Sequence, residues 1–162
     1  MIGGLPGVTS FDMPSDREIV VRRVFKASRT VVWDAWTRPE RVRRWMLDRQ
    51  GATMPICEID LHPGGKYRFI WSEPDGTELD TDGEFREVVP PERLVSAESW
   101  GRGWIDMLKT LLLAEKNGRT MLSCTLQFHS GQARSEALEG GIKETWSASL
   151  NRLDEYLQEP TG

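Results

Sequence analysis

Aromatic side chains are the most distinctive chemical feature of this sequence. Its 162 residues include seven Trp, against five Phe and two Tyr. Indole rings bind flat or hydrophobic molecules by stacking and apolar contact, and they also fill protein cores. The seven tryptophans are Trp33, Trp36, Trp45, Trp71, Trp100, Trp104 and Trp146. They predict either an aromatic-lined cavity or an unusually indole-rich core.

Several charged residues on predicted strands could supply acid–base chemistry if they faced such a cavity. The carboxylate candidates are Glu58, Asp60, Glu98 and Asp106. Desolvation in an apolar cavity would raise the pKa of a carboxyl group toward the range useful for catalysis. Lys109 would face inward if Leu111 and Leu113 do, unless the alternation slips at a bulge. The ordinary place for such charges is a strand edge or the rim of the pocket, so no residue is assigned as catalytic.

The two histidines, His62 and His129, fit no established catalytic pattern. Neither lies near a G-x-S-x-G nucleophile elbow, and two distant histidines without a carboxylate cluster make a poor metal site. The segment Gly101-Arg102-Gly103 lacks the helix and the lysine of a phosphate-binding loop. We therefore expect no metal and no cofactor.

The charge balance and the cysteine content restrict partners and location. Lys plus Arg is 21 and Asp plus Glu is 25, a formal charge of -4, which gives no general attraction to nucleic acid or membranes. Cys57 and Cys124 are interpreted as buried thiols. Residues 1–15 resemble neither a signal peptide nor a membrane span and are expected to form a flexible leader. The cytoplasm is the expected location. An arginine cluster is interpreted as a solvated helix face: Arg38, Arg41, Arg43, Arg44 and Arg49.

The hydrophobic pattern predicts the elements that must position these residues. A strand over 17–26 is followed by a helix that Ser28 caps. A second short helix begins near Pro39, with Thr37 and Glu40 at capping-box spacing. Period-two segments then predict strands over 56–61, 66–72, 81–89, 93–100, 104–115 and 119–128. An apolar stripe from about 135 to 157 predicts one long helix, kinked at Gly140-Gly141.

This order predicts an α+β fold in which a curved antiparallel sheet of about six to seven strands wraps the long C-terminal helix. We expect one domain over residues 16–159, with an internal pocket between helix and sheet. The candidate cavity residues are Trp45, Phe69, Trp71, Phe85, Trp100, Trp104, Met107, Ile142 and Trp146. Core packing is the simpler interpretation for Trp33, Trp36 and Trp146, whereas packing and ligand contact stay equally open for Trp71, Trp100 and Trp104.

Several segments together resemble the activator of heat-shock-protein-90 ATPase homologue-like family, within the START-like, helix-grip superfamily. They are 24–27 (VFKA), 32–37 (VWDAWT), Pro39-Glu40, 58–60 (EID), 63–65 (PGG), 74–77 (PDGT), 83–94 (GEFREVVPPERL) and 146–153 (WSASLNRL). The resemblance implies the helix-grip fold and a cavity for a small apolar guest. It further implies a C-terminal-type domain of the co-chaperone, standing alone.

Three functions follow as hypotheses. The leading one is a non-enzymatic domain that binds a hydrophobic or aromatic small molecule. The second is a cyclase-, dehydratase- or hydrolase-like enzyme that uses one buried carboxylate or His62. The third is an interaction protein that acts on a chaperone or a regulator. A homodimer is compatible with each of them.

Overall fold

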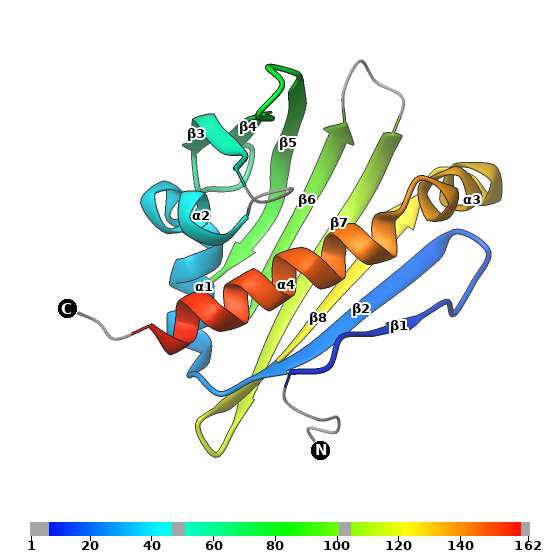
Figure 1. The fold of residues 1–162 in the computed structure, drawn as a ribbon. Helices are drawn as coiled ribbons and strands as arrows, with labels where there is room; N and C mark the ends of the chain where they lie inside the picture. The colour runs from blue at the N-terminus through cyan, green and yellow to red at the C-terminus, as the bar shows by residue number, and fades with distance from the viewer. Residues whose placement is uncertain (1–6, 47–50, 101–104, 160–162) are drawn as a thin grey trace.

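The period-two segments of the sequence form one antiparallel sheet of eight strands in the computed structural model, which describes residues 7–46, 51–100 and 105–159 (Figure 1). The strand order is β1-β2-β8-β7-β6-β5-β4-β3. The strands are β1 (Ser10–Asp12), β2 (Glu18–Phe25), β3 (Thr53–Ile59), β4 (Lys66–Ser72), β5 (Glu78–Val89), β6 (Arg93–Trp100), β7 (Ile105–Lys116) and β8 (Arg119–Phe128). The helices are α1 (Arg29–Thr37), α2 (Pro39–Trp45), α3 (Gly131–Glu139) and α4 (Ile142–Gln158).

The sheet has one strand more than the six or seven expected. The extra strand is β1, which lies in the segment expected to be a flexible leader. It pairs antiparallel with β2, with Phe11 opposite Val21. Three residues are too few to show an alternating pattern in the sequence. They form a strand because they pair with β2 at the edge of the sheet.

The two short helices after β2 begin as expected, but one predicted cap is wrong. Ser28 caps α1, accepting a hydrogen bond from the backbone N–H of Val31, and α2 begins at Pro39. No capping box forms, because the Thr37 hydroxyl donates instead to the carbonyl of Trp33 in the preceding turn. The N-cap of α2 is Arg38, whose side chain makes no capping bond.

The predicted long C-terminal helix is two helices, α3 and α4. Gly141, at the junction, has φ of 91°, a left-handed conformation that glycine adopts without steric cost. The expected kink at Gly140-Gly141 is therefore a complete break. The gripped helix is α4 alone, and α3 lies at its N-terminal end (Figure 1).

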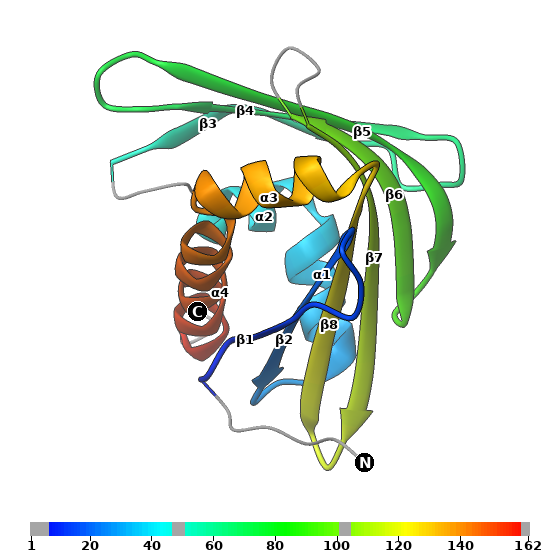
Figure 2. The ribbon, with the colours of Figure 1, turned by 90° about the vertical axis from the view of Figure 1, so that its right-hand side faces the viewer.

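All four helices lie on the concave side of the curved sheet (Figure 2). The apolar stripe of α4 packs into this concavity, and Leu150 and Leu153 are completely buried. Opposite them, the inward-facing side chains of β8 alternate along the strand, with Leu122, Cys124 and Leu126 fully buried. The core extends from this region to the buried aromatic side chains of α1, α2 and β4.

A buried arginine fastens α4 to the sheet. Arg23 on β2 is 4% exposed and faces the concave side. Its guanidinium donates to Asn151 Oδ1 at 2.6 Å and to Asp154 Oδ2 at 2.7 Å, both on α4. It also donates to the hydroxyl of Thr9, at 3.0 Å. The planar, multidentate guanidinium is suited to joining several acceptors on separate segments.

Replacing Arg23 by alanine should lower the free energy of unfolding by about 3 kcal/mol, because it leaves Asp154 without its cation. Urea denaturation measures this value. Arg22→Ala is the matched control, since Arg22 is exposed and its 3.7 Å pair with Asp12 should contribute less than about 1 kcal/mol. Equal losses in the two variants would contradict this role for Arg23.

Candidate functional site

The strand register brings residues from four strands into rows on the concave face. In one row, Thr81 of β5 lies between Phe69 of β4 and Trp100 of β6. In the next row, Gly83 lies between Tyr67 and Glu98. Lys109 of β7 is the partner of Ser96 and so lies one row further along. Aromatic and charged groups are therefore mixed on this part of the concave face.

A cavity lies between these rows and the helices α1, α2 and α4. It contains about 630 Å³ of space free of protein atoms, part of it open to solvent. It is narrow, since the centre of a water molecule can move within only about 70 Å³ of it. Its walls are mostly apolar: Trp36, Trp45, Met46, Phe69, Trp71, Leu79, Thr81, Glu98, Trp100, Lys109, Thr145, Trp146, Ser149 and Leu150. This shape suits a flat molecule better than a bulky one.

The aromatic wall of the cavity is held in place by hydrogen bonds. Trp71 and Trp100 stack with ring centroids 5.5 Å apart and planes 6° from parallel. The Trp71 indole N–H donates to the carbonyl of Met46, and that of Trp100 donates to Glu98 Oε2, at 2.6 and 2.7 Å. Both rings are therefore oriented before any ligand arrives.

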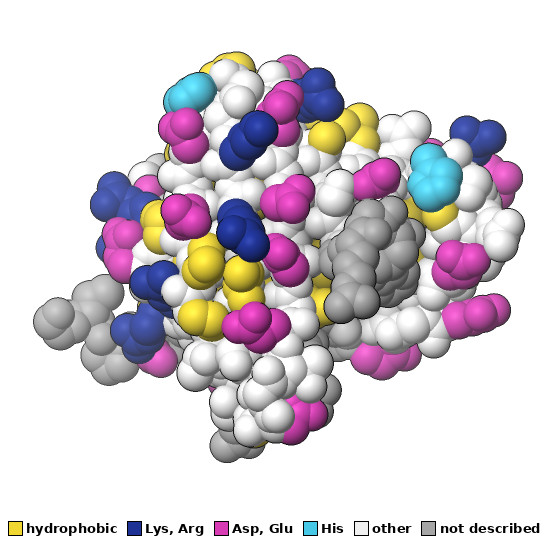
Figure 3. Space-filling model, turned by 90° about the horizontal axis from the view of Figure 1, so that it is seen from above, with side chains coloured by type: hydrophobic (Ala, Val, Ile, Leu, Met, Phe, Trp, Pro, Cys, Tyr) yellow, Lys and Arg dark blue, Asp and Glu magenta, His cyan; other side chains and the backbone are white. Residues whose placement is uncertain are grey.

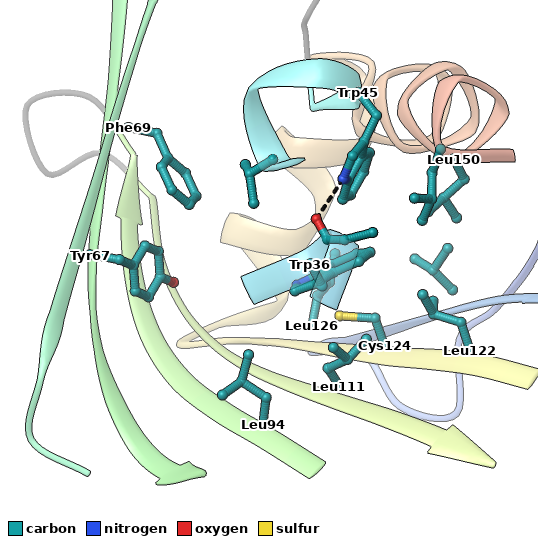
Figure 4. Close-up of a cluster of buried hydrophobic side chains, with 14 of the residues drawn as sticks. Trp36, Trp45, Tyr67, Phe69, Leu94, Leu111, Leu122, Cys124, Leu126 and Leu150 are labelled. Atoms are coloured by element: carbon teal, nitrogen blue, oxygen red, sulfur yellow. Dashed lines mark hydrogen bonds between the residues drawn. The ribbon is translucent and has the colours of Figure 1, made fainter. Parts of the chain in front are cut away.

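The helical wall is formed by indoles from α1, α2 and α4. The Trp36 ring packs on Trp45 at 5.0 Å and stacks on Trp146 at 6.1 Å. The Trp45 indole N–H donates to the carbonyl of Ala35, as Figure 4 shows. In the same view Tyr67 and Phe69 project from the sheet toward these helices (Figure 4). The cavity is thus aromatic on both of its faces.

Glycine at position 83 is required by the ring of Tyr67. A Cβ atom there would lie 2.3 Å from Tyr67 Cζ, far inside contact distance. The ring therefore lies flat over the β5 backbone, and its hydroxyl reaches Glu98 Oε1 at 2.6 Å. A larger residue at position 83 would displace the Tyr67 ring and with it the hydroxyl that donates a hydrogen bond to Glu98.

A buried ion pair crosses the floor of the cavity. Lys109 Nζ lies 2.7 Å from Glu98 Oε1, and the two side chains are 13% and 3% exposed. Glu98 also accepts the hydrogen bonds from Tyr67 and Trp100, so both of its oxygens are engaged. The Lys109 ammonium lies 5.9 Å from the centroid of Trp146 and 6.0 Å from that of Tyr67, a cation–π arrangement.

The surroundings keep both partners charged. Burial alone opposes ionisation of Glu98, but the Lys109 charge and the hydrogen bonds from Lys109, Tyr67 and Trp100 outweigh it and lower the pKa of this carboxyl group. Burial likewise opposes the charge on Lys109, yet the Glu98 carboxylate raises the pKa of the ammonium. For Tyr67, burial and the nearby Glu98 charge both raise the pKa of the phenol well above its usual value.

This electrostatic arrangement favours binding over proton transfer. A carboxylate with a lowered pKa is a weak base, and an ammonium with a raised pKa is a weak acid. The pair can instead orient a polar group of a guest, since Lys109 has N–H donors beyond the one that Glu98 accepts. Among the described residues, no group of three His, Cys, Asp or Glu side chains could hold a metal ion.

The structure places the predicted cavity residues on the walls of this cavity and of two adjoining extensions, an inner one that is smaller than it and an outer one that is larger. Trp45, Phe69, Trp71, Trp100 and Trp146 line the main cavity. The inner extension, beyond Tyr67, includes Phe85, and the outer extension, toward the α3–α4 junction, includes Met107 and Ile142. Trp104 lies outside the described residues. Ligand contact by these residues stays a prediction.

The charged candidates divide into two groups. Glu58, Asp60 and Asp106 are exposed, and His62 and His129 are exposed as well. The expected rim position is wrong for Glu98 and Lys109, which are buried inside. The register of β7 continues without a bulge, so Lys109 shares the inner face with Leu111 and Leu113. Its charge is tolerated there because Glu98 compensates it.

Sequence reasoning did not name Thr81 or Tyr67 as cavity residues, although Thr81 lines the main cavity and Tyr67 its inner extension. It favoured the core for Trp36, which also lines the main cavity. Strand alternation does place Tyr67 on the same face as Phe69 and Trp71. No local pattern distinguishes a cavity-lining position from a filled core position, because the difference depends on what lies opposite.

The arginines of α2 interact with acidic and aromatic neighbours. Arg44 pairs with Glu159 at 2.7 Å and lies over the Tyr156 ring, while Arg38 pairs with Asp34 at 3.5 Å. Arg49 lies outside the described residues. Elsewhere, on the face that Figure 3 shows, acidic and basic side chains are interspersed. In the described ranges, none of the helices has the length and apolar character needed to cross a membrane.

The chain matches the family model described as "Activator of Hsp90 ATPase homolog 1-like protein" over residues 26–158. Among curated proteins, none matches significantly. A crystal structure of a Rhodobacter sphaeroides protein is 26% identical, with a TM-score of 0.85 over 93% of this chain and 97% of that one. Protein Ms6760 from Mycobacterium smegmatis is 18% identical, with a TM-score of 0.82 over 96% and 98% of the two chains. CalU16 from Micromonospora echinospora is 23% identical, with a TM-score of 0.65 over 93% and 84%. The last two similarities concern the fold alone.

The ion pair should show strong thermodynamic coupling. Glu98→Gln or Lys109→Met alone should each cost about 3–5 kcal/mol, because each leaves an uncompensated buried charge. The double variant should cost clearly less than the sum of the two losses. Urea denaturation of all four proteins measures this cycle, and additive losses would refute the coupling.

The pair should also shape the stability at acid pH. Because the pKa of Glu98 lies below its ordinary value of 4.5 in the folded state, its contribution is complete above that value and is lost as the pH falls through the folded pKa. The unfolding free energy of the wild type should therefore fall more steeply below about pH 4.5 than that of the Glu98→Gln/Lys109→Met variant. Acid profiles that run parallel would contradict this expectation.

Proposed function

Since the chain belongs to the Activator of Hsp90 ATPase homolog 1-like family, we propose that it is a small-molecule-binding domain whose cavity takes a flat, hydrophobic guest. The observation that carries this proposal is the pre-oriented aromatic cavity between α4 and the sheet. Its predominantly apolar walls, with a few polar groups, are typical of ligand sites, and its narrow interior favours a flat guest.

The rigidity of the walls supports binding as well. The stacked Trp71 and Trp100 rings are fixed by hydrogen bonds at both indole nitrogens. A guest that inserts beside them loses little protein conformational entropy, because the rings are already ordered. Such pre-organisation favours a permanent binding site over a gap left by imperfect packing.

The catalytic alternative receives less support from the same site. Glu98 is the one carboxylate on the wall of the main cavity among the described residues, and its two oxygens already accept three hydrogen bonds. His62 is exposed, with its ring nitrogen 3.0 Å from Asp60 on the surface. We therefore propose binding without catalysis, in the cytoplasm. A homodimer or a chaperone partner stays a hypothesis that sedimentation and an ATPase assay would test.

Filling the cavity should abolish binding. Ser149 on α4 lines the cavity, so Ser149→Phe should insert a ring where the guest would lie. Titration of the wild type with a panel of two- and three-ring aromatic compounds should shift or quench the tryptophan fluorescence. Ser149→Phe should weaken the response to each binding compound at least tenfold.

Ser147→Phe is the matched control, because Ser147 lies on the same helix and does not line the cavity. It should bind as the wild type does. No response of the wild type to any member of the panel would overturn the proposal. Equal weakening by both substitutions would place the binding elsewhere.

A further inference from the structure

One wall of the cavity carries a buried hydroxyl group without a partner. Thr81 is 1% exposed, and its Oγ1 has no hydrogen-bond partner among the described residues. The residue lines the main cavity between Phe69 and Trp100. A buried hydroxyl that forms no hydrogen bond is costly, and buried polar groups are nearly always paired. Thr81 therefore lies on the cavity wall with a hydroxyl whose hydrogen-bonding capacity the described residues leave unused.

Lys109 presents a second unused contact to the same space. An ammonium has three N–H donors, and Glu98 is the one hydrogen-bond acceptor that the described residues give to Lys109. The ammonium otherwise faces the rings of Tyr67 and Trp146. Since lysine can only donate, the guest must offer it an acceptor atom.

The charge of the site restricts what that acceptor can be. Glu98 and Lys109 are the ionisable groups on the main cavity wall within the described chain, and their charges cancel. An anionic guest would add an uncompensated charge beside Glu98, and a cationic one would add it beside Lys109. Burying such a charge is expensive, whereas a neutral oxygen needs only hydrogen bonds.

We infer that the guest is an uncharged, flat aromatic compound carrying a carbonyl or similar oxygen, which Lys109 and Thr81 bind inside the cavity. This inference rests on the proposed function and specifies its ligand class. The aromatic walls hold the rings, and the two polar side chains set which end of the guest enters first.

Three naphthalenes of similar shape test the charge and the oxygen separately. They are 2-acetylnaphthalene, with a neutral carbonyl, 2-ethylnaphthalene, without oxygen, and 2-naphthoate, with a negative charge. Affinities are read from the indole N–H signals in ¹H–¹⁵N NMR titrations at neutral pH. We expect 2-acetylnaphthalene to bind at least about tenfold more tightly than either of the others, as a hydrogen bond to a charged donor implies.

Thr81→Val removes the hydroxyl with little change in shape. The variant should lose several-fold of the preference for the acetyl over the ethyl compound. Its melting temperature without ligand should rise by a few degrees, because a methyl group replaces an unpaired buried hydroxyl. Thr125→Val is the control, since Thr125 lies on the opposite face of the sheet, between the inward-facing Cys124 and Leu126. It should leave the preference unchanged.

The outcomes separate this inference from the proposed function. If none of the three compounds binds and the aromatic panel fails too, the proposed function falls. If the ethyl and acetyl compounds bind equally, or if 2-naphthoate binds most tightly, the inference is overturned while binding stands. An unchanged preference in Thr81→Val, or a lowered melting temperature, would overturn the role of Thr81.

Discussion

The need to compensate a charge inside the sheet governs the architecture of the cavity. Glu98 and Lys109 lie on neighbouring strands and are both buried, so each would be destabilising without the other. Lys109 neutralises the charge of Glu98 but donates to only one of its oxygens. Tyr67 donates a further hydrogen bond to that oxygen, and Trp100 donates to the other. That requirement fixes the side chains of β4, β6 and β7 relative to one another, and it explains why a glycine lies beneath Tyr67.

From this pair the order extends to the helices. Trp100, held by Glu98, stacks on Trp71, and Trp71 in turn donates to the carbonyl of Met46 at the end of α2. Lys109 faces Trp146 of α4, which stacks on Trp36 of α1. The same interactions that neutralise a buried charge thus set the width of the cavity and orient its aromatic walls. The cavity walls and the stability of the fold depend on one network, whereas Arg23 fastens α4 separately, from β2 near the opposite edge of the sheet.

Much of the fold could be predicted from the sequence. Alternation located β4, β6 and β8 to the residue, and the family resemblance implied the helix-grip arrangement that the family match and the structure confirm. The failures have local physical causes. β1 is too short to show a period, Thr37 bonds backward to Trp33 instead of forming a cap, and Gly141 adopts a positive φ that ends one helix before the next begins. Wherever the structure describes them, the predicted cavity residues line this cavity or its two extensions, and their contact with a ligand stays a prediction.

What the sequence determined by itself was which strand residues can share a face. Strand period put Lys109 on the face of Leu111 and Leu113 unless a bulge intervened, and the surplus of tryptophan indicated either an aromatic cavity or an indole-rich core. Only the tertiary structure decided that Glu98 and Lys109 meet inside and that Trp36 lines a cavity. It also decided that the Thr81 hydroxyl finds no partner among the residues that the structure describes. The physical reason is that the hydrophobic period shows on which face of a strand a side chain lies. It does not show how deeply that side chain is buried or which residues it contacts. Whether a buried charge or hydroxyl is tolerated depends on atoms contributed by strands and helices far apart in the chain.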